Sequence, residues 1–199
     1  TPMTDASGNA AVVIANTIRK IHAPVTAEIL LPDDGYREFY WAEAESTALK
    51  PFDGVERLGN GRYRICIPAT RLRTAAVLYA QKTPVPMLGL EVLRDEDAKS
   101  AATDRWTPLC RRGETIRVKV TGVNLPPGIL RLRAFSDWKV DPAELRVSGD
   151  GKAVEQVYTV TLPEQSPLYE PENPCPLLAE FTDAAGKRSA LCNAIVAVE

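Results

Sequence analysis

The chain has 199 residues, 45% of them apolar and 25% charged, and carries a formal net charge of -2. This composition is ordinary for a globular protein, and the length suits two domains of about 100 residues. A net charge this close to zero provides no general attraction to nucleic acid or to an anionic membrane. No apolar run approaches the roughly 20 residues needed to span a bilayer. We therefore expect no nucleic-acid partner and no membrane span.

The first eighty or so residues alternate between apolar and polar side chains, which is typical of strands that bury one face. In the clearest case, Tyr63, Ile65 and Ile67 share one side of a strand. Asn60-Gly61 before it predicts a tight turn, because both residues tolerate a positive φ. The predicted strands are Ala10–Ala15, Val25–Leu31, Tyr36–Ala42, Arg62–Pro68 and Thr74–Ala80.

A proline-containing segment, Gln81–Pro86, separates the two halves of the chain. Pro84 and Pro86 have no backbone N–H to donate, so a central strand cannot run through this segment. The prolines also favour an extended, semi-rigid conformation. We predict a joint here, between a β-sandwich domain over residues 1–83 and a second one over residues 84–199.

The second half has a regular series of strand patterns with turn signals about every ten residues. This density is typical of an Ig-like or fibronectin-III-like sandwich. The predicted fold class is therefore all-β, with two tandem β-sandwich domains, the second Ig-like. The predicted strands are Met87–Leu93, Ile116–Val120, Leu130–Ala134, Trp138–Val140, Glu144–Ser148, Val154–Leu162, Leu177–Thr182 and Ser189–Val198.

The cysteines suggest disulfides and argue against a zinc site. They are even in number, lack CxxC spacing and are accompanied by a single histidine, so we expect no metal. Disulfides in an oxidising compartment are the preferred interpretation, and buried free thiols are the alternative. The sequence leaves the pairing open. The candidates are Cys66, Cys110, Cys175 and Cys192.

Pairing Cys175 with Cys192 is attractive because a predicted hairpin lies between them. A turn at residues 183–187, however, places Cys192 opposite residues near Ala179 and not opposite Cys175. A bridge therefore requires the segment 174–176 to fold across the hairpin.

The sequence offers little support for catalysis. His22 is the only histidine, and the chain has neither a GxSxG motif nor a glycine-rich phosphate loop. Acidic groups such as Asp33-Asp34 and Asp95–Asp97 are interpreted as solvated surface, and not as an acid/base pair or a calcium loop. We expect no catalytic residue, metal or cofactor.

An aromatic cluster between Tyr36 and Trp41 provides the best candidate for a binding site. On a strand, Phe39 and Trp41 share one face, while Tyr36, Glu38 and Tyr40 share the other. If one face is core, the other forms an exposed aromatic strip beside a carboxylate. Such a strip suits sugars, whose C–H faces stack on aromatic rings while a carboxylate accepts hydrogen bonds from hydroxyls. In the preferred interpretation, however, the tyrosines merely cover the sheet or pack on the other domain.

Basic residues on two predicted strands would form a cationic face if the strands were neighbours. Arg117 and Lys119 lie on one strand, and Arg131 and Arg133 on the other. Such a face could bind an anionic glycan or nucleic acid. Like charges opposite one another are unfavourable. Acidic residues such as Glu155 on a facing strand would relieve this, so an internally paired, solvated face is the preferred interpretation.

Several segments resemble domains of a known class. Asp137–Pro142 (Asp-Trp-Lys-Val-Asp-Pro), Tyr158–Pro163 and Gly113–Val118 are similar to strands of Ig-like accessory domains of secreted bacterial glycoside hydrolases. This resemblance covers about residues 86–199. Gly61–Pro68 is similar to a strand of the β-domain that often follows the catalytic barrel of those enzymes.

The resemblance implies a non-catalytic accessory segment that packs against or spaces a catalytic domain, or contacts carbohydrate. Its partners would be polysaccharide or an adjoining catalytic domain, and its location secreted, periplasmic or at the cell surface. An alternative is a stand-alone extracellular binding or adhesion module. An enzyme with an unrecognised carboxylate site is the less favoured alternative. The candidate ligand-binding residues remain Tyr36, Glu38 and Tyr40.

Overall fold

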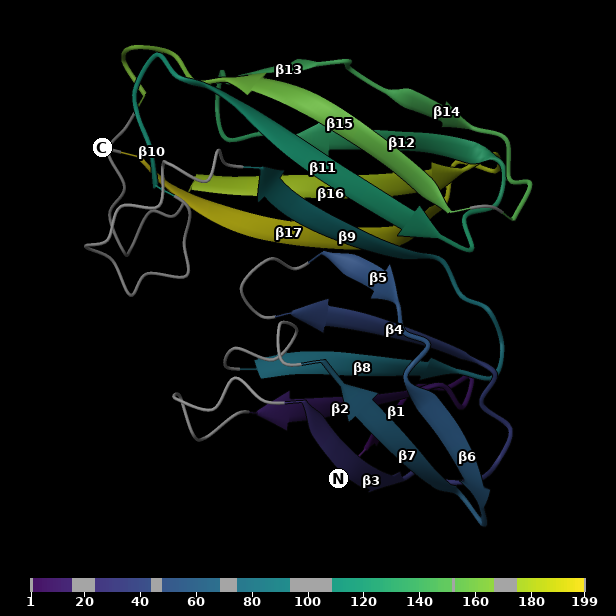
Figure 1. Ribbon diagram of the computed structural model, residues 1–199. Coiled ribbons are helices and arrows are strands. Elements are labelled where there is room, and N and C mark those ends of the chain that lie inside the picture. Colours follow the sequence, from purple (N-terminus) through teal and green to yellow (C-terminus); the bar gives the residue numbers. More distant parts are fainter. Residues whose placement is uncertain are drawn as a thin grey trace. The chain divides into compact units, whose positions relative to one another are not determined.

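The structure is a computed structural model that describes residues 2–15, 24–43, 48–68, 75–93, 109–151, 153–166 and 175–198. The chain divides into two compact units, Thr1–Val85 and Pro86–Glu199. All regular elements in the described residues are strands, so the predicted all-β class is confirmed (Figure 1). A helix long and apolar enough to cross a bilayer does not occur in the described part of the chain.

The first unit is built from two antiparallel sheets. The larger has the order β1-β2-β8-β4-β5 and the smaller β3-β7-β6. The strands are β1 (Met3–Thr4), β2 (Ala10–Ala15), β3 (Val25–Leu30), β4 (Glu38–Glu43), β5 (Leu49–Pro51), β6 (Val55–Gly59), β7 (Arg62–Ile67) and β8 (Ala75–Gln81). Alternation predicted five of these strands, but it missed β1, β5 and β6.

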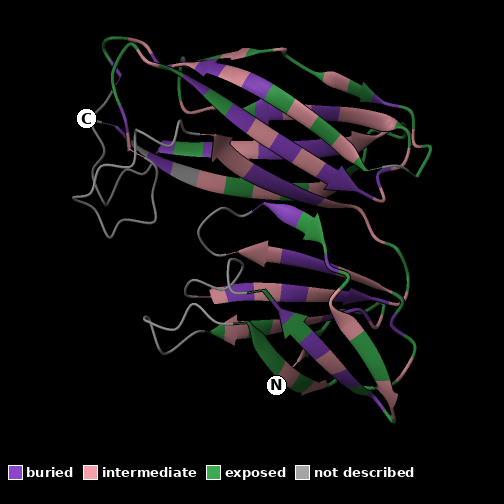
Figure 2. Cartoon of the chain, viewed as in Figure 1, coloured by how far each residue is buried: buried purple, intermediate pink, exposed green. Residues whose placement is uncertain are grey.

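The core of the first unit lies between its two sheets. Ile65 and Ile67 of β7 are at most 1% exposed and belong to one cluster with Trp41 of β4 and Leu78 of β8. Figure 2 shows buried and exposed residues alternating along β7. Burying each such side chain favours folding by about 1.5–3 kcal/mol. The predicted inward face of this strand is confirmed.

The predicted tight turn connects β6 to β7. Asn60 and Gly61 both have a positive φ, of 55° and 73°. The Asp34 carboxylate accepts hydrogen bonds from both backbone N–H groups, at 2.9 and 2.8 Å. A side chain at Gly61 would place a Cβ 2.3 Å from the carbonyl oxygen of Leu31, so this position requires glycine.

The segment 81–86 begins where β8 ends and is attached to the first unit. The side-chain oxygen of Asn9 accepts hydrogen bonds from the backbone N–H groups of Lys82 and Thr83, at 2.9 and 3.2 Å. Asn9 is only 7% exposed, and its own N–H donates to the Asp5 carboxylate at 2.9 Å. These bonds fix the first residues of the segment to the unit that precedes it.

The second unit also contains two groups of paired strands, with orders β13-β15-β11-β9 and β10-β17-β16-β12-β14. All pairings are antiparallel except that of β10 with β17, which is parallel. The strands are β9 (Met87–Leu93), β10 (Leu109–Cys110), β11 (Thr115–Val123), β12 (Gly128–Arg133), β13 (Lys139–Asp141), β14 (Leu145–Val147), β15 (Val154–Thr161), β16 (Cys175–Asp183) and β17 (Arg188–Val198). Among these, the sequence missed only β10.

The basic residues of the second unit do not form one face, because β11 and β12 belong to different sheets. The condition for a shared cationic face, neighbouring strands, is therefore not met. The preferred interpretation, internal pairing, is confirmed. The Lys119 ammonium nitrogen lies 4.0 Å from a carboxylate oxygen of Glu155, and a guanidinium nitrogen of Arg131 lies 2.8 Å from a carboxylate oxygen of Glu144.

All four cysteines are free, so the predicted disulfides are not formed. Cys192 lies opposite Ala179, as the turn position predicted, whereas Cys175 lies opposite Val196 in the regular part of β16. Cys175 and Ala179 are thus four strand residues apart, about 13 Å. Bridged cysteines have Cα atoms within about 7 Å. Burial also raises the pKa of the Cys175 and Cys192 thiols, which keeps them protonated and unreactive.

Thiol titration checks this assignment. We expect four reactive thiols in denatured, unreduced protein. In the folded protein we expect Cys66 to react fastest, because it is the exposed cysteine. A thiol-specific chromogenic reagent, applied with and without denaturant, measures both quantities. Fewer than four thiols after denaturation would show that a bridge exists.

Tyr158 links the two groups of strands in the core of the second unit. Its side chain is fully buried, and its hydroxyl donates a hydrogen bond to the carbonyl oxygen of Leu130 at 3.2 Å. Burial raises the pKa of Tyr158 from 10.0 to about 12, because the phenolate would lose its hydration.

We expect the free energy of unfolding to fall as the pH rises from 10 to about 12. Below this window both states hold the phenol proton. Within it only the unfolded state loses the proton, which favours unfolding by at most about 1.4 kcal/mol per pH unit. Tyr158→Phe removes this contribution, so urea denaturation of both proteins across the window should give a shallower pH dependence for the variant. Equal slopes would contradict the assignment.

Candidate functional site

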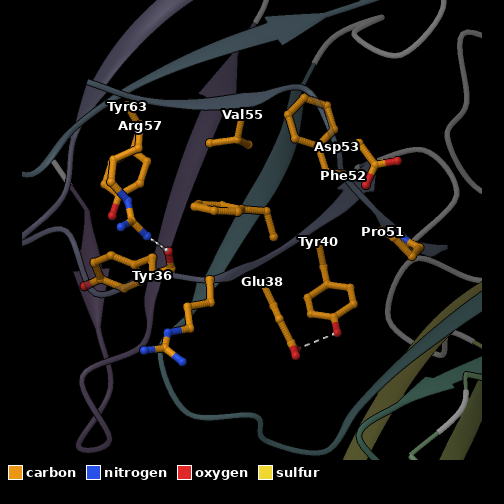
Figure 3. A pocket seen from close by; sticks show the side chains of 11 residues that line it. Tyr36, Glu38, Tyr40, Pro51, Phe52, Asp53, Val55, Arg57 and Tyr63 are labelled. Carbon is orange, nitrogen blue, oxygen red and sulfur yellow. Dashed lines mark hydrogen bonds between the residues drawn. The ribbon is translucent and has the colours of Figure 1, made fainter. Parts of the chain in front are cut away.

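An open pocket of about 720 Å³ lies in the first unit, around the beginning of β4 (Figure 3). Its lining combines aromatic side chains with charged groups of both signs. The lining residues are Tyr36, Arg37, Glu38, Phe39, Tyr40, Pro51, Phe52, Asp53, Val55, Arg57 and Tyr63.

The pocket arises where the chain crosses from one sheet to the other. β5 pairs with β4 as far as the Tyr40–Pro51 position. The chain then leaves this sheet, and β6 begins at Val55 in the smaller sheet. At the crossing, the N–H of Phe52 donates a hydrogen bond to the carbonyl oxygen of Phe39 at 2.9 Å. The pocket is therefore lined by the first residues of β4 and by the residues of the crossing.

Aromatic contacts build the inner wall of the pocket. The Phe39 and Tyr63 rings have centroids 5.6 Å apart, and Tyr36 meets Tyr63 edge-on at 6.2 Å. Phe52 stacks on the buried Trp41 at 5.1 Å with an interplanar angle of 20°. Rings that pack on one another in this way have little freedom to rotate. The wall is therefore a preformed apolar surface.

Polar and charged groups accompany the rings. The Tyr40 hydroxyl donates a hydrogen bond to the Glu38 carboxylate at 2.9 Å, and Arg57 donates to the carbonyl oxygen of Tyr36 at 3.0 Å (Figure 3). The side chains of Arg37 and Asp53 are exposed. The site thus offers hydrogen-bond donors and acceptors beside an apolar wall.

The predicted division of the aromatic cluster is partly right. Phe39 and Trp41 pack in the core, as one face was expected to do. Tyr36, Glu38 and Tyr40 all line the pocket. The exposed aromatic strip that the sequence allowed is nevertheless not formed, because Tyr36 is only 1% exposed and Tyr40 only 8%.

Tyr36 departs from the prediction because β4 begins only at Glu38. The alternation of faces therefore does not extend back to Tyr36. Its ring packs in the core, and its hydroxyl donates a hydrogen bond to the carbonyl oxygen of Gly8 at 3.1 Å. Burial raises the pKa of Tyr36.

Lys82, the second residue of the segment 81–86, contacts the ring of the pocket residue Tyr36. Its ammonium group lies 4.7 Å from the centre of the Tyr36 ring and forms an ion pair with Asp33. The hydrogen bond from Lys82 lowers the pKa of Asp33, and the same bond raises the pKa of Lys82. This cluster fixes the loop that leads into β4.

Sequence reasoning missed the part of the site that β6 and the crossing before it contribute, namely Arg57 of β6 and Phe52 and Asp53 of the crossing. The Asn60-Gly61 turn was the available signal, since a tight turn before one strand implies a partner strand on its other side. The histidine and the acidic run considered above, His22 and Asp95–Asp97, lie outside the described residues. Within the described residues, no group of acidic, histidine and cysteine side chains could hold a metal ion.

No family model and no curated protein matches the chain. Several solved structures are similar to it at a low level, including the following two. The sporulation control protein Spo0M from Bacillus subtilis is 14% identical with a TM-score of 0.37, over 59% of this chain and 50% of that one. A Niemann-Pick type C2 protein from the Japanese carpenter ant is 11% identical with a TM-score of 0.34, over 59% of this chain and 95% of that one. The match spans half of the Spo0M chain, and neither likeness informs function.

Proposed function

We propose that the chain is a non-catalytic β-sandwich segment whose first unit binds carbohydrate, as an accessory part of a carbohydrate-active protein. The observation that carries this proposal is the pocket itself. It brings Glu38 and Tyr40 together beside packed aromatic rings.

The pocket has the chemistry that a sugar needs. A sugar ring presents apolar C–H faces, which pack on an aromatic side chain such as the half-buried Phe39. Its hydroxyls require hydrogen-bond acceptors, which the carboxylates of Glu38 and Asp53 supply. The volume of about 720 Å³ falls in the range of small-molecule pockets, roughly 300–1,000 Å³.

We also propose an Ig-like plan for the second unit. Its supporting features are two groups of strands with orders β13-β15-β11-β9 and β10-β17-β16-β12-β14. In Ig domains the first, second and fifth major strands likewise form one sheet, and the third, sixth and seventh the other. β9, β11 and β15 correspond to the first group, and β12, β16 and β17 to the second.

Polysaccharide and an adjoining catalytic domain are the partners that accompany this role. A secreted, periplasmic or cell-surface location belongs with it and rests on the resemblance to accessory domains. The free cysteines give no argument for an oxidising compartment. The same pocket would also serve a stand-alone binding module. A catalytic domain in the reading frame around this segment would favour the accessory role over the stand-alone one.

A glycan array tests the proposal. We expect the unmodified protein to bind a subset of immobilised glycans, and Glu38→Ala to weaken this binding about tenfold or more, because a charged hydrogen-bond acceptor is removed. Glu56→Gln is the matched control, since Glu56 is an exposed β6 carboxylate that pairs with Arg64 and does not line the pocket. The proposal fails if no glycan is bound, or if Glu38→Ala binds as well as the control.

A further inference from the structure

We infer that the pocket of the first unit prefers an acidic saccharide, whose carboxylate binds between the guanidinium groups of Arg37 and Arg57. This inference rests on the proposed carbohydrate function and adds the class of sugar. Both arginines line the pocket, and both are exposed.

The backbone brings the two arginines together. Arg57 donates a hydrogen bond to the carbonyl oxygen of Tyr36 at 3.0 Å. That carbonyl belongs to the peptide bond that joins Tyr36 to Arg37. Two positively charged residues are therefore held at the same peptide group, one on the strand β6 and the other immediately before β4.

These arginines differ from their neighbours in having no acidic partner among the described residues. On β7, the guanidinium group of Arg62 lies 2.6 Å from the carboxylate of Glu28, and that of Arg64 lies 2.7 Å from the carboxylate of Glu56. By contrast, neither of the two pocket arginines forms an ion pair with another described residue. Among the described arginines of the first unit, the two without an ion pair are therefore the two that line the pocket.

Neither guanidinium group has a described carboxylate within ion-pair distance, so a bound anion would supply the counterion that both lack. A carboxylate matches the planar guanidinium group, which donates two parallel hydrogen bonds to it. The two arginines of the pocket thus offer guanidinium donors to one carboxylate, a group that a neutral sugar lacks.

The remainder of the pocket suits hydroxyl groups better than further negative charge. Asp53 and Glu38 are hydrogen-bond acceptors and would repel a second anion. In Figure 3, Arg57 and Tyr36 lie on one side of the pocket and Asp53 on the other. A ligand with one carboxylate, several hydroxyls and an apolar ring face satisfies all of these groups. A uronic acid residue has this structure.

Calorimetric titration with a matched pair of ligands tests the inference. The probes are an oligosaccharide of uronic acids and the same oligosaccharide with its carboxylates methyl-esterified. We expect the acid form to bind about tenfold or more tightly than the ester, with a preference that shrinks as salt is added. Arg37→Gln and Arg57→Gln should each abolish most of this preference.

Arg62→Gln is the matched control, because Arg62 is an exposed arginine of the same unit that pairs with Glu28 outside the pocket. Thermal unfolding verifies that each variant folds. Arg57→Gln could unfold the protein because its hydrogen bond to Tyr36 is lost. Arg37→Gln then still tests the preference for the acid, since the Arg37 side chain makes no hydrogen bond to another described residue.

The outcomes separate the two proposals. If glycans bind but acid and ester bind equally, or if the arginine variants keep the preference for acid, the inference is overturned and the carbohydrate function stands. If neither form binds and the glycan array is also blank, the proposed function fails and the inference fails with it.

Discussion

The packing of Tyr63 between Tyr36 and Phe39 is the contact on which the first unit depends. Tyr63 comes from the smaller sheet and Phe39 from the larger, so the ring contact at 5.6 Å joins the two layers. The Tyr63 hydroxyl also donates a hydrogen bond to the carbonyl oxygen of Asp33 at 3.2 Å. One side chain therefore positions the core, the loop before β4 and the wall of the pocket.

The strands were largely predictable because they bury one face and alternate strictly. Along β7, every second residue is apolar, and those residues form the core. The register of the final hairpin followed from its turn, which placed Cys192 opposite Ala179. Short strands escaped prediction for a physical reason. β5 and β10 have three and two residues, too few to show a period.

The site was less predictable than the fold. The sequence indicated Glu38 and Tyr40, but assigning Tyr36 to the same exposed face required the strand to begin two residues earlier than it does. Whether an arginine has an acidic partner depends on strand pairing and not on composition. Arg57 and Arg62 look alike in the sequence, yet within the described part of the chain Arg62 forms an ion pair and Arg57 does not. That difference emerges only when β3, which carries Glu28, is paired with β7.

The hydrogen bonds from Asn9 have a consequence for how the first unit can be connected to other domains. They join a residue near the beginning of the unit to Lys82 and Thr83 at its end, and Ala10 pairs directly with Ala80. The chain therefore enters and leaves this unit at nearly the same place. A domain with adjacent ends can be inserted into a surface loop of another protein without stretching the host. The first unit has the geometry of a transferable module, whatever follows it in the chain.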